Sequence, residues 1–146
     1  MSGIPEFANA YGLYFDPADP GTMYLETGPV YIESSEGDLY KSVDGGQNWT
    51  IIHFAVDFFT IIPGDPSVLF VGAWTQRSHR NYFILYKSTN GGGEWTNANS
   101  GLPTTRRMLA LVSSPTNPSN LFAANEEGRV FKSTNLGRTW TSTELR

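Results

Sequence analysis

The sequence predicts an all-β fold made of three repeated four-stranded units, and three observations lead to this prediction. A ten-residue segment recurs as KSVDGGQNWT (41–50), KSTNGGGEWT (87–96) and KSTNLGRTWT (132–141). A turn motif of the form Pro-x-Asp/Asn-Pro precedes each copy, and short apolar runs flank that motif. The composition is 14% aromatic with 15 glycines and 9 prolines, and no stretch favours a helix.

Each unit is expected to hold four antiparallel strands, which we call A to D. Strands A and B are the apolar runs on either side of the proline turn, which lies at 17–20, 63–66 and 115–118. Strand C ends at the serine of the repeated segment, and strand D begins at its tryptophan. The units are placed at 11–53, 56–99 and 106–144 in a domain of 11–146, and residues 1–10 are interpreted as a leader or a cloning remnant.

The repeated segment has the form Ser-x-Asp/Asn-x-Gly-x-x-Trp, which we interpret as a turn between strands C and D. The carboxylate or amide accepts hydrogen bonds from turn amides, glycine supplies the positive φ that other residues resist, and tryptophan covers the turn. Asparagine keeps the acceptor but loses the charge, so the second and third turns should be weaker. The residues with this structural role are Ser42, Asp44, Gly46, Trp49, Ser88, Asn90, Gly92, Trp95, Ser133, Asn135, Gly137 and Trp140.

The three tryptophans are 46 and 45 residues apart, a period typical of propeller blades. The motif resembles the Asp-box, or BNR repeat, of sialidases, sortilin-type receptors, xyloglucanase-type glycoside hydrolases and photosystem II assembly factors. The resemblance covers nearly the whole chain and implies three β-propeller blades with structural Asp-box turns. It implies no single function, because the activities of these families differ.

Composition and charge exclude several classes of partner. The formal net charge is −4 and no basic run occurs, which argues against nucleic acid and anionic membranes. No apolar stretch reaches the roughly 20 residues that cross a bilayer, so no membrane insertion is expected. The absence of cysteine excludes disulfides but leaves the compartment open, and a secreted parent would make it extracellular or periplasmic.

The lengths of the connections indicate where a ligand binds. From the last proline of the turn to the serine of the repeat the interval is 22, 22 and 15 residues, whereas the A–B and C–D turns keep their lengths. Variable B–C and D–A connections share one end of the blades, and such loops tend to carry binding residues. The ligand-binding candidates there are Tyr31, Trp74 and Tyr82 for stacking, Arg77, Arg80, Arg106 and Arg107 for carboxylates, and Glu33. The alternative for each is an ordinary loop residue, and for Trp74 it is packing between blades.

A non-catalytic binding or scaffold module, with a glycan or a protein as ligand, is the favoured function. The alternative is a glycoside hydrolase, sialidase-like or xyloglucanase-like, or a fragment of one. Such an enzyme needs two acids set across the scissile bond, and the acids at the loop end are Glu33, Glu36, Asp38 and Asp57. The Phe-Arg-Ile-Pro type motif of sialidases is absent.

No cofactor and no metal is expected. Calcium at Asp44 is the alternative, but two of the three equivalent residues are neutral amides, and calcium sites usually recruit several carboxylates. His53 and His79 stand alone, without metal-ligand spacing.

Three blades leave the outer faces of the first and third blades exposed, whereas closed propellers have roughly four to eight blades. Either the chain is a fragment of a longer one, or two copies form a homodimer that closes a six-blade ring.

Overall fold

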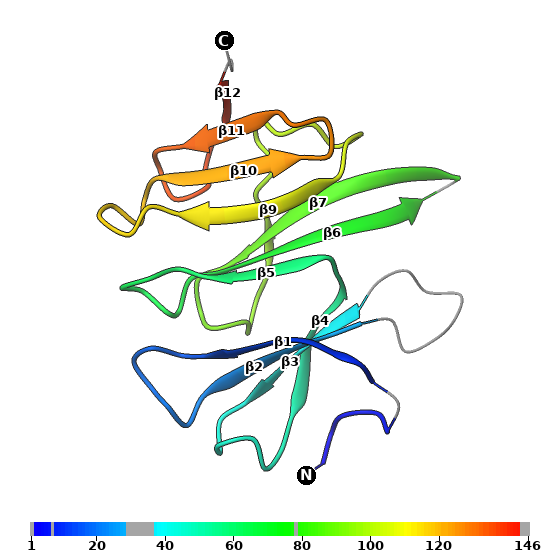
Figure 1. Ribbon diagram of the computed structural model, residues 1–146, viewed down its shortest axis with the longest axis vertical. Helices are drawn as coiled ribbons and strands as arrows, with labels where there is room; N and C mark the ends of the chain where they lie inside the picture. Colours follow the sequence, from blue (N-terminus) through cyan, green and yellow to red (C-terminus); the bar gives the residue numbers. More distant parts are fainter. Residues whose placement is uncertain (1, 7, 29–36, 78, 144–146) are drawn as a thin grey trace.

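The computed structural model describes residues 2–6, 8–28, 37–77 and 79–143 as three four-stranded antiparallel sheets (Figure 1). Each sheet follows the order of the sequence, so the predicted all-β architecture of three four-stranded blades is confirmed. In these ranges no helix is long and apolar enough to cross a bilayer. Blade 1 consists of β1 (Ala10–Phe15), β2 (Met23–Thr27), β3 (Gly37–Ser42) and β4 (Thr50–Val56). Blade 2 consists of β5 (Phe58–Ile61), β6 (Leu69–Arg77), β7 (Arg80–Ser88) and β8 (Thr96–Asn97). Blade 3 consists of β9 (Met108–Ser113), β10 (Leu121–Asn125), β11 (Val130–Ser133) and β12 (Thr141–Thr143).

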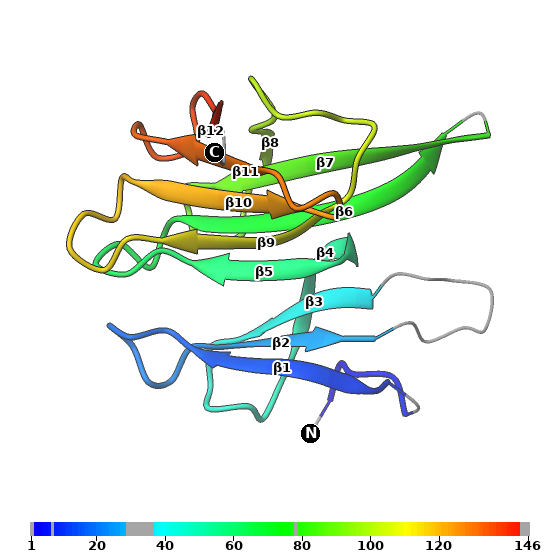
Figure 2. The same ribbon diagram turned by 45° about the horizontal axis from the view of Figure 1, so that its top comes forward.

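The three blades stack one after another, with blade 1 at the N-terminal end and blade 3 at the C-terminal end (Figures 1 and 2). The pairing of strands B and C repeats from blade to blade. The serine that ends strand C lies opposite Met23, Leu69 and Leu121 in blades 1, 2 and 3. This common register makes positions in the three blades directly comparable.

The proline turns between strands A and B are held by the acidic or amide side chain at their centre. Asp19, Asp65 and Asn117 each accept a hydrogen bond from the backbone N–H two residues later, at 3.0, 3.3 and 3.2 Å. Each of these residues also accepts from the backbone N–H three residues later through its own carbonyl. The same local hydrogen bonds therefore close all three A–B turns, as their shared sequence predicts.

The turns between strands C and D, which we call the box turns (42–49, 88–95 and 133–140), repeat one set of hydrogen bonds. In each turn the serine Oγ accepts from the glycine N–H four residues later at 2.9 Å. These glycines, Gly46, Gly92 and Gly137, have φ of 87°, 91° and 78°, a region that L side chains rarely adopt. Each box turn also donates a backbone N–H to the A–B turn of its own blade, at 2.9, 2.9 and 3.0 Å, so both turns lie at the same end.

Apolar clusters between the sheets hold the blades together. The boundary between blades 1 and 2 buries Tyr24, Leu39, Val56, Phe59, Leu69 and Val71. The boundary between blades 2 and 3 buries a larger group that includes Phe70, Phe83, Leu85, Met108, Leu121 and Trp140. Because each blade gives one face to each neighbour, the alternation of side chains along strands A to C follows directly from the two-residue period of a strand.

Trp95 and Trp140 each fasten their own box turn to the blade before it. Trp95 Nε1 donates to the Ile52 carbonyl at 2.9 Å, and Trp140 Nε1 donates to the Ala98 carbonyl at 3.0 Å. Trp49 instead donates to Gly46 in its own turn at 3.0 Å. The tryptophans at the two inner boundaries therefore bridge blades, whereas the first one closes its own turn.

Candidate functional site

The end of the blades opposite the box turns, which we call the loop face, is built from Asp57, the tip of the β6–β7 hairpin and residues 104–107 and 126–129. The candidates Tyr31 and Glu33, and the acid Glu36, lie outside the described residues. The remaining candidates fall into two groups. Trp74, Arg77, Arg80 and Tyr82 belong to the hairpin, and Arg106 and Arg107 precede β9.

The β6–β7 hairpin extends well beyond the strands beside it (Figure 1). Its register pairs Trp74 with Phe83, Thr75 with Tyr82, and the Arg77 backbone with that of Arg80. Phe83 is fully buried, and the half-buried Trp74 packs against the same apolar cluster. The indole therefore helps to hold the hairpin on its blade, while Tyr82 is half-buried and Arg80 is exposed at the tip.

Residues 98–107 are fixed to this hairpin by hydrogen bonds that continue from the short strand β8. The buried side chain of Asn99 accepts from the Leu85 N–H at 2.8 Å and donates to the Phe83 carbonyl at 3.3 Å. The Phe83 N–H donates to the Thr104 carbonyl at 2.7 Å. Arg106 and Arg107 therefore directly follow a segment that is anchored to the hairpin.

Arg107 joins blades 2 and 3 at the loop face. Its guanidinium forms an ion pair with Asp57, whose side chain is only 5% exposed just before β5. Its backbone N–H and carbonyl also bond to Glu126, at 3.4 and 3.0 Å. The neighbouring Arg106 pairs with Glu127, and both of these side chains stay exposed. Arg107 is thus used by the scaffold, whereas Arg106 is accessible.

Tyr14 and Glu26 form a second polar pair that the sequence did not single out. The Tyr14 hydroxyl donates to Glu26 Oε2 at 3.0 Å, and Glu26 is 8% exposed. Burial, reinforced by the Glu26 charge, raises the pKa of Tyr14 to about 12. Burial also raises the pKa of Glu26, against the hydrogen bond from Tyr14 and together with the charge of Asp57. The sequence carries one signal of this pair. Glu26 follows Tyr24 by two residues on β2, so both side chains lie on the same, inward face of the strand.

Glu26 and Asp57 are therefore two buried carboxyls, and the charge of Asp57 contributes to the raised pKa of Glu26. Burial raises the pKa of Asp57, although Arg107 lowers it. Asp57 Oδ2 is buried and has no hydrogen-bond partner among the described residues. A glycosidase holds its two acids on opposite sides of a sugar. Because both carboxyls are less than a tenth exposed, their position suits contacts between blades better than contact with a substrate.

The other titratable candidates near the first boundary also lie in packed positions. The ring of His53 packs on Tyr86 and Trp95, with centroids 4.6 and 5.1 Å apart, and burial lowers its pKa. Asp38 lies on β3, where burial raises its pKa. His79 is exposed at the tip of the hairpin. His53 is therefore a packing residue at a blade boundary.

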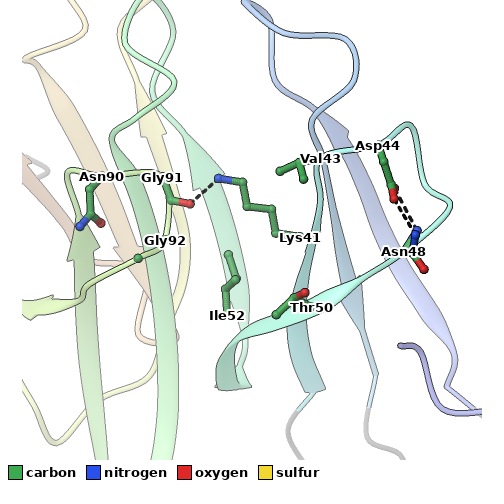
Figure 3. Close-up of a pocket in the computed structure, with 10 residues that line it drawn as sticks. Lys41, Val43, Asp44, Asn48, Thr50, Ile52, Asn90, Gly91 and Gly92 are labelled. Atoms are coloured by element: carbon green, nitrogen blue, oxygen red, sulfur yellow. Dashed lines mark hydrogen bonds between the residues drawn. The ribbon is translucent and has the colours of Figure 1, made fainter. Parts of the chain in front are cut away.

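A cleft of about 340 Å³ opens at the other end, between the box turns of blades 1 and 2 (Figure 3). Its charged groups are engaged in hydrogen bonds. Lys41 Nζ donates to the Gly91 carbonyl at 2.8 Å, and Asp44 accepts from the Asn48 backbone and side chain at 2.9 and 2.7 Å. These bonds from Asn48, with that from Ser42, lower the pKa of Asp44 to about 2. The cleft is lined by Lys41, Val43, Asp44, Asn48, Thr50, Ile52 and residues 90–93.

Metal binding in this cleft would have to rely on one carboxylate. Within the described ranges, no group of three or more His, Cys, Asp or Glu side chains is placed to hold a metal ion. Both oxygens of Asp44 already accept hydrogen bonds from its own turn. The chemistry of this carboxylate is therefore that of an acceptor that closes a turn.

Comparison with known proteins identifies solved structures but no sequence relatives. No family model and no curated protein matches the chain. An ancestral GH74 enzyme is 21% identical with a TM-score of 0.70, over 97% of this chain and 19% of that chain. A GH74 enzyme from Niastella koreensis is 23% identical with a TM-score of 0.68, over 93% and 22%.

Structures of YCF48 are also similar to this chain. YCF48 from Cyanidioschyzon merolae is 16% identical with a TM-score of 0.63, over 96% of this chain and 38% of that chain. YCF48 bound to D1 peptide is 16% identical with a TM-score of 0.51, over 95% and 42%. The chain thus spans less than half the length of each of these four chains. At these identities the likeness shows the fold, which is a partial β-propeller.

Proposed function

We propose that the chain is a non-catalytic binding segment of an Asp-box β-propeller, and that its loop face binds an acidic segment of a protein partner. The observation that carries this proposal is the division among the charged residues of that face. Asp57 and Arg107 are used in a contact between blades. Arg80, Arg106 and Arg129 remain exposed.

The exposed arginines suit a carboxylate ligand. A guanidinium presents a planar fork of donors that matches a carboxylate. Arg106 is paired with Glu127, but an exposed ion pair contributes little, so a ligand carboxylate can replace Glu127 at small cost. Arg129, with a 70% exposed side chain, lies 3.9 Å from the same glutamate.

A protein ligand fits this face better than a glycan. Sugar recognition commonly uses an open aromatic ring, but the aromatic candidates of the described loop face, Trp74 and Tyr82, are both half-buried. Trp74 moreover packs against the apolar cluster of blades 2 and 3. A structural relative of similar fold, YCF48, was solved with a bound peptide, which supports the same class of ligand.

Binding of a labelled acidic peptide with a free C-terminal carboxylate, measured by fluorescence anisotropy, tests the proposal. The double variant Arg80→Ala, Arg106→Ala should bind at least tenfold more weakly, since a charge-assisted hydrogen bond contributes about 1.5–3 kcal/mol. Arg138→Ala is the matched control, because it removes an exposed arginine from the box turn of blade 3. Equal affinities of the double variant and the control would contradict the proposal.

A glycoside hydrolase is the second candidate, and one observation favours it. Glu26 and Asp57 are carboxyls with raised pKa values near one another, with Tyr14 and Arg107 bonded to them. Hydrolysis of xyloglucan and of sialosides by the wild type, Glu26→Gln and Asp57→Asn would test this. Turnover that both carboxyl variants abolish, and that the double arginine variant retains, would replace the binding proposal.

A further inference from the structure

The outer faces of blades 1 and 3 expose apolar side chains at positions that are buried inside the stack. By register, Leu13 opposite Leu25 is equivalent to Phe59 opposite Val71 and to Leu111 opposite Ala123. Phe59 and Leu111 are each 5% exposed, whereas Leu13 is 54% exposed. On blade 3, Val112 is 57% exposed and faces away from blade 2. Blade 1 therefore presents the surface that a preceding blade covers at the two inner boundaries.

Each inner boundary is also fastened by a lysine of strand C. Lys41 Nζ lies 5.5 Å from the Tyr24 ring and donates to the Gly91 carbonyl of the next box turn at 2.8 Å (Figure 3). Lys87 Nζ lies 5.7 Å from the Phe70 ring and donates to the Leu136 carbonyl at 2.7 Å. Gly91 and Leu136 occupy the same position of their box turns, so the two boundaries share one bridge.

The outer face of blade 3 carries the same bridge without its acceptor. Lys132 Nζ lies 5.7 Å from the Phe122 ring, in the arrangement of the two inner lysines. Among the described residues no carbonyl accepts from it. The equivalent acceptor is the carbonyl of Gly45 on blade 1, which receives no lysine within the same part of the chain. The lysine donor without an acceptor thus lies on blade 3, and the carbonyl acceptor without a lysine lies on blade 1, at opposite ends of the stack.

The apolar side chains at the two ends are complementary in the same way. At the first boundary the Phe59 ring lies 5.2 Å from the Tyr14 ring and 5.1 Å from the Tyr24 ring. The positions of Tyr14 and Tyr24 correspond on blade 3 to Val112 and Phe122, which face each other across β9 and β10. A side chain at the position of Leu13 would therefore contact Val112 and Phe122.

The N-terminal residues leave this surface of blade 1 open. The Trp49 N–H donates to the Ser2 carbonyl at 3.0 Å, just as the Trp140 N–H donates to the Ser100 carbonyl at 2.8 Å, and Gly3 and Gly101 both have φ of 94°. Ile4 packs on the Trp49 cluster without covering Leu13. Blade 3 contacts both the equivalent segment, through Ser100 and Trp140, and strand A of blade 2, through the Thr60 hydroxyl and the Leu111 carbonyl. A docked blade and residues 2–5 are therefore compatible on blade 1.

We infer that a second copy of this chain docks its blade 1 on blade 3, and that Lys132 donates to the carbonyl of Gly45 of the partner subunit. Leu13 of the partner subunit then packs on Val112 and Phe122. The contact is head to tail, and repeating it once closes a ring of two chains. Two chains of three blades give the one multiple of three within the roughly four to eight blades of closed propellers.

A charge exchange tests this contact by light scattering coupled to size exclusion. The wild type is expected at twice the 16.1 kDa of one chain at micromolar concentration. Leu13→Glu and Val112→Lys should each elute as single chains, because each buries an unpaired charge in the contact. The double variant Leu13→Glu, Val112→Lys should regain the doubled mass, because the two new charges meet across each contact.

Val43→Glu is the matched control. Val43 is 70% exposed, but its side chain lines the cleft between blades 1 and 2 and not the outer face of blade 1, so this variant should keep the doubled mass. Lys132→Met, which keeps the apolar stem and removes the ammonium, should weaken dimerisation about tenfold, as expected for one charge-assisted hydrogen bond. A folded wild type of single-chain mass, or single variants that keep the doubled mass, would overturn the inference.

Discussion

The two ends of the blades differ in how faithfully they repeat. At the box turns, the serine Oγ accepts from a glycine N–H at 2.9 Å in all three blades. At the loop face, the contacts are individual: Asp57 with Arg107, Arg106 with Glu127, and the Thr104 carbonyl with the Phe83 N–H of β7. The comparison indicates that the repeated end maintains the scaffold, and that the irregular end is where the chain can vary without losing the fold.

The largest effect is expected from removing a buried tryptophan at the repeated end. Trp140 is 3% exposed and bridges to Ala98, so Trp140→Ala should lower the free energy of unfolding by about 3–5 kcal/mol. Trp95→Ala should lower the free energy of unfolding by clearly less, because Trp95 is only half-buried. Urea denaturation followed by circular dichroism measures both. Equal losses would show that burial does not set the contribution of these tryptophans.

A smaller effect is expected at the loop face, where one contact behaves as part of the scaffold. Arg107→Ala leaves the buried Asp57 unpaired and should destabilise by about 3 kcal/mol, since breaking a buried ion pair strands one charge. Arg106→Ala, which breaks an exposed pair, should cost less than about 1 kcal/mol. Denaturation midpoints of the two variants compare them directly. Similar midpoints for the two variants would contradict a structural role for Arg107.

The pH dependence of the Arg107→Ala penalty gives an independent check. Burial raises the pKa of Asp57 above 3.8, so the native state binds its proton more readily than the unfolded chain. Stability therefore falls as pH rises from 3.8 through the raised value. Without Arg107 this fall should steepen, so the penalty should be smaller at acidic than at neutral pH. A penalty that does not change with pH would contradict the assignment of the effect to Asp57.

The smallest effect is expected from Asp44→Asn in the first box turn. Asn90 and Asn135 already close the other two turns, each accepting a backbone N–H at 2.8 and 2.9 Å. The pKa of Asp44 is lowered from 3.8 to about 2, so its contribution is present above 3.8 and is lost as pH falls towards 2. The variant should be slightly less stable than the wild type at neutral pH and should decline less steeply in acid, so that the two converge as pH falls towards 2. Parallel acid profiles would contradict this role.

The repeated end could be predicted from the sequence because its interactions are local. The proline turns and the box turns each close within six or eight residues, so their residue types reveal their geometry. Leu136 in the third box turn, with φ of 55°, shows that a repeat can tolerate a departure from glycine.

The loop face could not be predicted as well, because its contacts join residues far apart in the chain. Asp57 and Arg107 are 50 residues apart, and only the stacking of blades 2 and 3 brings them together. Tyr14 and Glu26 are 12 residues apart on neighbouring strands, so the pattern within either strand does not pair them. The likeness of Ser2–Gly3–Ile4–Pro5 to Ser100–Gly101–Leu102–Pro103 was visible in the sequence, but its meaning depended on the shared contact with a box tryptophan.

Native-state hydrogen exchange tests most directly the claim that the box turns maintain the scaffold. The amides of Gly92 and Gly137 donate to buried serine hydroxyls, so their exchange should require global unfolding. Their opening free energies should equal that of denaturant unfolding and fall with denaturant at the same slope, whereas the amides of residues 126–128 should exchange through local opening. Exchange of Gly92 and Gly137 by local opening, independent of denaturant, would contradict the account.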